Sequence, residues 1–354
     1  MEKTADTAGS VDREFDFLCV DDFMRHMFDA GALATAFETG LVDMLCREGE
    51  TTAQTLLEQL GLDGRGGDFL LDLLASSGVI REERGTLSLT DRFVDALRFR
   101  DLMELRLTLS NFAAHDFLDF FSDLVTSPER FMSKARFHRL FAYDRGSGFT
   151  EEDLAMTKRW MHITTVLTRY EARACLKYYD FSRHKNVLDV GGNSGELALR
   201  LCRAHPDLRA TVLDLSLVCR VGREHIAGQP EEARIVFRNG NALTDDFPGG
   251  HDLVIFKSML HDWPDHVARD LMRKAAGSLE PGGAMVLFER AAPVPNTGVP
   301  AHSVLPFLIF FHSYRAPEFY GSVLRDLGFS DIQSTIITLE MPFLLVTGRR
   351  GDGK

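Results

Sequence analysis

Cysteine is scarce in this chain of 354 residues, and no two of its five cysteines are spaced as a CxxC pair. Small secreted domains that depend on disulfides carry an even, dense set of cysteines, because each bridge needs two of them. An odd and scattered set excludes such a framework. We therefore expect reduced thiols and a cytoplasmic protein.

Clusters of basic residues are also missing. The longest run of Lys or Arg is the pair Arg349-Arg350, and the formal net charge is −12. An excess of acid repels phosphate backbones, so we do not expect nucleic acid as a partner. The partners expected are a small molecule and a second copy of the chain.

Long apolar runs are absent as well. The longest, Val304 to Phe311, is interrupted by Pro306 and is far shorter than a membrane span. The first ten residues are polar and lack the apolar centre of a signal peptide. We therefore expect no membrane partner.

What the chain does contain is a distinctive stretch from Asn186 to Glu196, which reads Asn-Val-Leu-Asp-Val-Gly-Gly-Asn-Ser-Gly-Glu. It has the pattern of a short apolar strand, a glycine turn and the start of a helix. Gly191, Gly192 and Gly195 let the backbone approach a ligand where any Cβ would clash. Such a ligand lies at the carboxyl ends of parallel strands, near a helix N-terminus. Surface turns also carry glycines, so the pattern needs support from the rest of the chain.

That support begins with the alternation of strands and helices after residue 185. Strands are expected at 186–190, 210–214, 234–238, 252–256 and 284–289, with helices at 195–204, 217–227 and 266–279. This order predicts an α/β fold with a doubly wound, mainly parallel, Rossmann-like sheet. Residues 332–338 and 343–347 are expected to close the sheet as an antiparallel hairpin.

The N-terminal part has a different rhythm. A helix ending at Leu60, a helix over 67–76 and alternating segments at 78–82 and 85–90 together predict a winged helix. DNA binding does not follow, because the second helix is acidic and apolar over 68–74. A helix that reads a DNA groove needs Arg, Asn or Gln. We therefore expect a dimerisation role.

Three regions are expected in all. Residues 1–100 form the N-terminal helical and winged-helix dimerisation domain, and residues 181–354 form the cofactor-binding catalytic domain. Residues 101–180 are helical and rich in Phe, and a capping box at Thr150-Glu151-Glu152-Asp153 begins their last helix. We expect this region to roof an acceptor pocket. Its phenylalanines are at positions 112, 117, 120, 121, 131, 137, 141 and 149.

The cofactor is indicated by two acids. Asp214 ends the second strand, where a carboxylate can accept hydrogen bonds from both ribose hydroxyls of an adenosine. A dinucleotide dehydrogenase has an acid at the same place, but Asn193 interrupts the Gly-x-Gly-x-x-Gly that a pyrophosphate needs. Asp189, just before the glycines, would repel a pyrophosphate and suit a cationic sulfonium. S-adenosylmethionine therefore fits better than NAD.

Several segments together resemble a known family. They are Val187-Leu188-Asp189-Val190-Gly191-Gly192, Asp214-Leu215, Asn239-Gly240-Asn241, Leu260-His261-Asp262-Trp263 and Glu280-Pro281-Gly282-Gly283. In this order and at these separations they are similar to the small-molecule O-methyltransferases of the caffeic-acid and hydroxyindole type, which include bacterial natural-product enzymes. The winged-helix N-terminus resembles that family's dimerisation domain, so the likeness covers nearly the whole chain and implies a homodimer.

The resemblance implies that S-adenosylmethionine contacts Gly191, Asp214, the pair Asn241-Ala242 and Lys257. It also implies that His261 is the general base in methyl transfer to a hydroxyl of an aromatic or polycyclic small molecule. A free phenol has a pKa of about 10 and an imidazole one of about 6.5, so an imidazole can take the phenol proton as the methyl moves.

Asp262 or Glu289 could fix the tautomer of His261 and hold its imidazolium form. Plainer interpretations remain open: Glu289 could merely cap its strand, and Lys257 could be a solvated surface charge. The identity of the acceptor, and whether oxygen, nitrogen or carbon is methylated, stay open as well.

Two positions depart from the family pattern. Asn241 stands where an Asp is usual, although its amide oxygen can still meet an adenine amino group. Tyr314-Arg315-Ala316 stands where plant members have a second catalytic Glu before an Arg-Thr pair.

These departures leave two alternatives. His261, Asp262 and His312 could form a two-histidine, one-carboxylate iron site for methylation at carbon of a 2-oxo acid. Alternatively, the chain could bind the cofactor as a dimer without transferring a methyl group.

Overall fold

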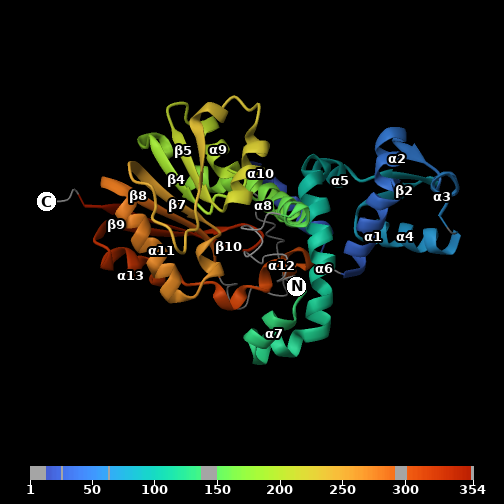
Figure 1. Cartoon of the computed structure of the whole chain (residues 1–354). Coiled ribbons are helices and arrows are strands. Elements are labelled where there is room, and N and C mark those ends of the chain that lie inside the picture. Colours follow the sequence, from blue (N-terminus) through green and yellow to red (C-terminus); the bar gives the residue numbers. More distant parts are fainter. Residues whose placement is uncertain (1–12, 25–26, 63, 137–149, 292–300, 352–354) are drawn as a thin grey trace, which may run out of the picture.

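The structure is a computed structural model that describes residues 13–24, 27–62, 64–136, 150–291 and 301–351. Figure 1 shows a small N-terminal lobe and a larger C-terminal lobe on opposite sides of one long helix, α6 (Arg100–Thr126). The lobes share a continuous apolar core, because Leu33 of the N-terminal lobe and Phe288 of the C-terminal sheet belong to one cluster of buried side chains.

The N-terminal lobe confirms the predicted order of helix, helix and hairpin. Thr52 caps the first of these helices by accepting a hydrogen bond from the backbone of Thr55. The elements are η1 (Arg13–Phe23), α1 (Met27–Glu38), α2 (Leu41–Glu48), β1 (Glu50–Thr51), α3 (Ala53–Leu60), α4 (Gly64–Ser76), β2 (Ile80–Glu83), β3 (Thr86–Leu89), α5 (Asp91–Ala96) and η2 (Leu97–Phe99). Strands β2 and β3 pair antiparallel, with Ile80 opposite Leu89.

The middle of the chain is helical, as predicted. After α6 come α7 (Pro128–Lys134) and α8 (Glu151–Tyr178). The predicted capping box is present, because Thr150 and Asp153 exchange hydrogen bonds between side chain and backbone. Phe117 and Phe131 are buried, whereas Phe112 and Phe121 are exposed. Phe137, Phe141 and Phe149, which were expected to belong to the same helical region, lie outside the described residues.

The C-terminal lobe is built on a seven-stranded sheet in the order β6-β5-β4-β7-β8-β10-β9. The first five of these are parallel, and β10 runs antiparallel to both β8 and β9. The strands are β4 (Asn186–Val190), β5 (Arg209–Asp214), β6 (Ile235–Asn239), β7 (His251–Lys257), β8 (Leu279–Arg290), β9 (Phe329–Thr338) and β10 (Pro342–Arg350). The predicted doubly wound sheet and its closing hairpin are confirmed.

Helices cover both faces of this sheet (Figure 1). One face packs against α9 (Glu196–Ala204) and α8, and the other against α11 (Asp265–Ser278) and α13 (Pro317–Asp326). The remaining elements are α10 (Ser216–Ile226), α12 (Leu305–Leu308) and the short 3-10 helices η5 (Phe181–Arg183), η6 (Glu232–Arg234), η7 (Leu260–Asp262), η8 (His302–Val304) and η9 (Phe311–Ser313). This winding brings the carboxyl ends of β4, β5, β7 and β8 to one edge, where the site lies.

None of the helices in the described part of the chain has both the length and the apolar composition needed to cross a bilayer.

Candidate active site

A cavity of about 440 Å³ lies at the carboxyl ends of the parallel strands. Of the ten residues expected to bind the cofactor or to act in catalysis, nine line it: Asp189, Gly191, Gly192, Asp214, Asn241, Ala242, Lys257, His261 and Asp262. The tenth, Glu289, lies behind His261. One end of the cavity is formed by the glycine turn and the ends of β5 and β6. The other end is formed by η7, α12 and one face of α8.

The glycine positions of this turn have no room for a side chain. Gly191 and Gly195 have φ angles of 68° and 74°, a region that L side chains rarely adopt. A Cβ on Gly192 would come within 2.6 Å of the Asp189 carboxylate, and one on Gly191 within 2.8 Å of the Met259 side chain. The backbone can therefore lie directly against a ligand in the cavity.

Two carboxylates stand at this end of the cavity. Asp214 accepts hydrogen bonds from the backbone N–H groups of Asn193 and Leu215, each at 2.8 Å. Asp189 is buried, and its Oδ2 has no hydrogen-bond partner among the described residues. Burial, with a smaller contribution from the charge of Asp214, raises the pKa of Asp189 to about 7, and burial raises the pKa of Asp214 to about 6. A cationic ligand would stabilise the ionised form of both.

Asn241 stabilises the turn that follows β6 through its own hydrogen bonds. Its side-chain oxygen accepts the backbone N–H of Leu243 at 3.0 Å, and its backbone N–H donates to Asp245 at 2.9 Å. The side chain also lines the cavity, next to Ala242. The departure from Asp therefore leaves the turn intact, with an amide in place of a carboxylate.

Lys257 is not a solvated surface charge, because its side chain is only 10% exposed. Its ammonium group donates to the Thr168 hydroxyl at 2.9 Å and forms an ion pair with Glu171. Glu171, fully buried on α8, also pairs with Arg290. Glu171 and Arg290 are not among the residues predicted from the sequence, since nothing in a helical pattern marks a single acid as the partner of two distant cations.

His261 lies on η7 and is held by Glu289. Its Nδ1 is 2.6 Å from Oε2 of Glu289, whose Oε1 accepts the backbone N–H groups of Met259 and Leu260, each at 2.9 Å. A carboxylate so placed requires a proton on Nδ1, which leaves the lone pair on Nε2. Oδ1 of Asp262 lies 3.5 Å from that Nε2. Of the two acids considered, Glu289 is therefore the one that selects the tautomer.

Tyr314 stands where plant members of the family have a second acid. Its ring meets the His261 ring edge to face, with 5.2 Å between centroids, and its hydroxyl donates to the carbonyl of Phe307 at 2.8 Å. Burial raises the pKa of Tyr314, so the phenol is neutral. Tyr314 therefore supplies an aromatic wall and no charge.

Arg315, the next residue, holds η7 in place. Its guanidinium donates to the carbonyls of Leu260 and Trp263 and to the Asp265 carboxylate. From the sequence, Arg315 was noted only as part of a segment that differs from the family pattern, and its contacts with η7 could not be predicted.

The iron site considered as an alternative is not formed. His312 is exposed, does not line the cavity, and has its Nε2 3.0 Å from the carbonyl of Leu124. Within the described ranges, no three His, Cys, Asp or Glu side chains are grouped in a way that could hold a metal ion. His312 therefore meets α6 rather than His261.

Comparison with protein-family models matches residues 130–330 to an O-methyltransferase domain and residues 22–95 to an O-methyltransferase dimerisation domain. The chain belongs to the O-methyltransferase family. It is therefore an enzyme of the methyltransferase class, and the resemblance drawn from the sequence motifs is confirmed. The alternative of a dimer without transfer activity loses its support.

Two relatives show how far the likeness extends across this O-methyltransferase. The 3-hydroxy-5-methyl-1-naphthoate 3-O-methyltransferase of Streptomyces sahachiroi is 25% identical, over 88% of this chain and 89% of its own. The acetylserotonin O-methyltransferase of Gallus gallus is also 25% identical, over 84% of this chain and 88% of its own.

Solved structures show the same fold. The S-adenosylmethionine-dependent methyltransferase SibL, in its apo form, matches with a TM-score of 0.64 and 25% identity, over 91% of this chain and 96% of its own. The O-methyltransferase NcsB1, solved with S-adenosylmethionine and 2-hydroxy-5-methyl naphthoic acid, matches with a TM-score of 0.66 and 21% identity, over 92% and 97%.

Proposed function

We propose that this enzyme moves a methyl group from S-adenosylmethionine to a hydroxyl of an aromatic or polycyclic small molecule, with His261 as general base. One observation carries the proposal: a single cavity has the carboxylates of Asp189 and Asp214 beside a glycine turn at one end and an imidazole held by Glu289 at the other. A cationic methyl donor and a weakly acidic acceptor would therefore meet inside it.

The cofactor end fits S-adenosylmethionine. The free oxygen of Asp189 and the open backbone at Gly191 and Gly192 suit a ligand that carries positive charge and lies against the chain. Asp214 is placed to accept from ribose hydroxyls, and Asn241 and Ala242 to face the adenine. Lys257, with Asp189, borders the region between the two ends. The sulfonium supplies the driving force of the transfer, so the protein has mainly to align the groups.

The acceptor end fits a flat apolar molecule. Its walls are mainly aliphatic and aromatic side chains, namely Leu109, Ile163, Leu167, Phe307, Phe310 and Tyr314. The phenylalanines in this wall come from the segment around α12; no described phenylalanine of residues 101–180 contributes, although α8 of that region does form one side. Relatives that methylate a naphthoate or acetylserotonin act on aromatic acceptors of this kind.

His261 is placed to remove the acceptor proton. Glu289 leaves the lone pair on Nε2, and Glu289 can stabilise the imidazolium that forms when Nε2 takes the proton. Removing the proton as the methyl arrives makes the acceptor oxygen a better nucleophile at neutral pH. Asp262, 3.5 Å from Nε2, adds a second negative charge near the imidazolium.

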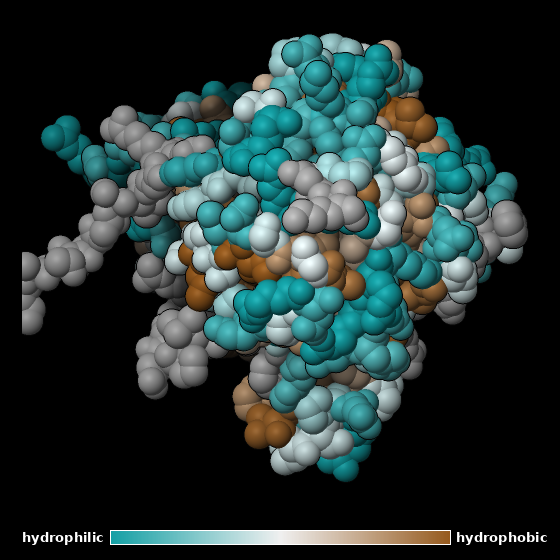
Figure 2. Space-filling model, turned by 90° about the vertical axis from the view of Figure 1, so that its left-hand side faces the viewer, coloured by the Kyte–Doolittle hydropathy of each residue, from teal (hydrophilic) through white to brown (hydrophobic). Residues whose placement is uncertain are grey.

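The enzyme is proposed to work as a homodimer. The family's dimerisation domain covers residues 22–95, and exposed apolar side chains in it include Met27, Phe28 and Phe69. More lie near the end of α6, at Leu118, Phe121 and Val125. Figure 2 shows brown, apolar atoms at the low end of the molecule, where Figure 1 places α7 and that end of α6. Such exposed apolar groups are typical of protein interfaces.

The proposal is tested by calorimetric titration with S-adenosylhomocysteine, followed by incubation of the enzyme with S-adenosylmethionine and a panel of phenols and hydroxynaphthoic acids. We expect micromolar binding and at least one methyl ether, identified by mass spectrometry and NMR. Absence of binding would contradict the cofactor, and a methyl group found on carbon or nitrogen would contradict the reaction.

A further inference from the structure

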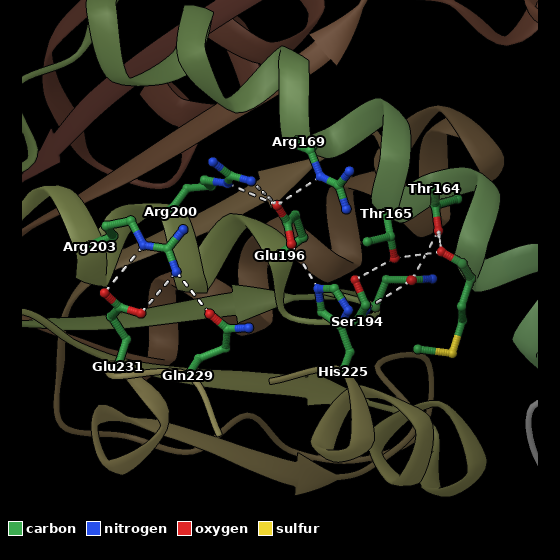
Figure 3. Close-up of polar contacts among 12 residues, drawn as sticks. Thr164, Thr165, Arg169, Ser194, Glu196, Arg200, Arg203, His225, Gln229 and Glu231 are labelled. Atoms are coloured by element: carbon green, nitrogen blue, oxygen red, sulfur yellow. Dashed lines mark hydrogen bonds and ion pairs between the residues drawn. The ribbon is translucent and has the colours of Figure 1, made fainter. Parts of the chain in front are cut away.

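The glycine turn is joined to α8 by two adjacent hydrogen bonds (Figure 3). The Thr164 hydroxyl donates to the side-chain oxygen of Asn193 at 3.0 Å, and the Thr165 hydroxyl lies 2.7 Å from the Ser194 hydroxyl. Consecutive residues of the turn thus meet consecutive residues of the helix. We call these four residues the turn–helix clasp.

The turn side of the clasp belongs to the cofactor end. Asn193 has a φ of 56°, a left-handed conformation that Asn tolerates better than most residues other than glycine. Its backbone N–H donates to Asp214 at 2.8 Å, and its side-chain oxygen also accepts the backbone N–H of Ser194 at 2.8 Å. The carboxamide is therefore fixed by the same turn that holds the proposed ribose-binding acid.

The helix side of the clasp belongs to the acceptor end. Five residues of α8 line the cavity, namely Trp160, Ile163, Thr164, Leu167 and Thr168. Their spacing is that of one face of an α-helix. Thr164 lies in the middle of this face, so its hydrogen bond to the turn helps to fix the position of the α8 residues that line the cavity.

The Thr164 hydroxyl has a choice of acceptors. It has one proton, and the backbone carbonyls of Met161 and Trp160 lie 3.1 and 3.4 Å away, against 3.0 Å for Asn193. Bonding within the helix is thus available when the turn moves. The bond to Asn193 is consequently a contact that the state of the turn can make or break without unfolding α8.

We propose that Asn193 and Ser194 are positioning residues, through which the occupied cofactor turn sets the α8 wall of the acceptor end. The inference rests on the proposed function, because it assumes a cofactor at the turn. On the cofactor side, Asp214 accepts the backbone N–H of Asn193. On the acceptor side, Thr164 donates to the side chain of Asn193. Binding of the cofactor then orders the wall against which the acceptor packs, which favours cofactor binding before acceptor binding.

The test is hydrogen exchange, followed by mass spectrometry, with and without S-adenosylhomocysteine. The variant is N193G/S194A, which removes the Asn193 carboxamide and the Ser194 hydroxyl and keeps a backbone that glycine adopts freely at position 193. In the wild type, we expect the ligand to slow exchange at both 189–195 and 160–168. In the variant, the ligand should still slow exchange at 189–195, with its effect at 160–168 reduced about 3- to 10-fold, as the loss of one or two hydrogen bonds implies.

Two variants on α8 serve as controls. T164S keeps the hydroxyl and should behave as the wild type, whereas T164V should reproduce part of the double variant's effect. Thr157 is buried on the same helix and does not line the cavity, so T157V should leave the ligand effect at 160–168 unchanged.

The inference is overturned if the ligand slows exchange at 160–168 equally in N193G/S194A and in the wild type. It is also overturned if the variant exchanges faster there to the same degree with and without ligand, since that marks a structural role alone. If the wild type does not bind S-adenosylhomocysteine at all, the proposed function fails first and the inference falls with it.

Discussion

Nδ1 of His261 lies 2.6 Å from Glu289, and the other oxygen of the same carboxylate accepts the backbone N–H groups of Met259 and Leu260. Three donors thus converge on one buried side chain at the end of β8. Because the carboxylate cannot turn without losing two backbone bonds, the imidazole it holds has one available tautomer. That tautomer leaves the basic lone pair on Nε2, which is the atom proposed to take the acceptor proton.

Replacement of Glu289 by Gln is expected to lower turnover by about 10²-fold or more. The amide oxygen can keep the two backbone hydrogen bonds, but the amide NH₂ then faces Nδ1 and favours the tautomer with its proton on Nε2. That tautomer cannot accept a proton from the acceptor. Steady-state kinetics would show the loss in kcat, with S-adenosylhomocysteine affinity kept within about 3-fold in calorimetry. A variant with wild-type kcat would contradict this role of Glu289.

Replacement of Asp214 by Ala is expected to raise the dissociation constant of S-adenosylhomocysteine by about 10-fold or more, because hydrogen bonds to a charged group are the strong ones. Calorimetric titration measures the change directly. Glu231 is a suitable control, since its carboxylate pairs with Arg203 and does not line the cavity. If Asp214→Ala and Glu231→Gln bind the ligand equally well, the ribose does not lie at Asp214.

The pKa of Asp189, raised to about 7 from its usual value near 3.8, predicts how stability changes with pH. The folded protein without cofactor favours the protonated acid, so this contribution to stability is full below about pH 4. It is lost as pH rises through about 7. The melting temperature of the cofactor-free enzyme should therefore fall between about pH 4 and pH 7, and the fall should be smaller in Asp189→Asn.

The ionised form of Asp189 is the one that suits a cation. S-adenosylmethionine should therefore bind more tightly at pH 8 than at pH 6, and its binding should release protons near pH 6.5. Calorimetry in two buffers of different ionisation enthalpy measures that release. Equal heats in both buffers would show that no acid in the cavity changes its protonation on binding.

Glu171 is expected to matter for stability. It is the shared partner of Lys257 and Arg290, and all three side chains are at least nine-tenths buried. Glu171→Gln leaves two buried cations without their counter-charge, which should lower the free energy of unfolding by about 3–5 kcal/mol. Glu224 on α10 offers a matched control. It pairs with Lys158, which lies on α8 like Glu171, but the side chains of Glu224 and Lys158 are both about half exposed. Glu224→Gln should cost less than about 1 kcal/mol in the same denaturant titration.

The sheet and most of the cavity could be predicted from the sequence. Strand segments such as 252–256 are short apolar runs between turn residues, and the residues that follow parallel strands must meet at one edge. Asp189 and Asp214 follow from this pattern, and the resemblance to the family adds Lys257 and His261. The prediction succeeds because both the strand pattern and the place of its carboxyl end are local properties of the chain.

Contacts between elements distant in the sequence could not be predicted. Glu171 lies inside α8 with no local sign that Lys257 and Arg290 will reach it, and Thr164 has no local sign that Asn193 will. Phenylalanines of residues 101–180 were expected to line the pocket, whereas among the described residues the phenylalanines that line the cavity are Phe307 and Phe310. Helical spacing shows which residues share a face, and only the tertiary fold shows whether that face meets a core, a cavity or solvent. For the same reason, the sequence could not show that His312 meets the Leu124 carbonyl of α6 and not the cavity.

The role of His261 as general base is tested by comparing wild type with His261→Asn in transfer of an isotopically labelled methyl group from S-adenosylmethionine to the phenols and hydroxynaphthoic acids of the panel. We expect a labelled methyl ether from the wild type and at least about 10²-fold slower formation in the variant. The two proteins should bind S-adenosylhomocysteine with affinities within about 3-fold of each other. Equal rates of methyl ether formation in the two proteins would contradict this role of His261.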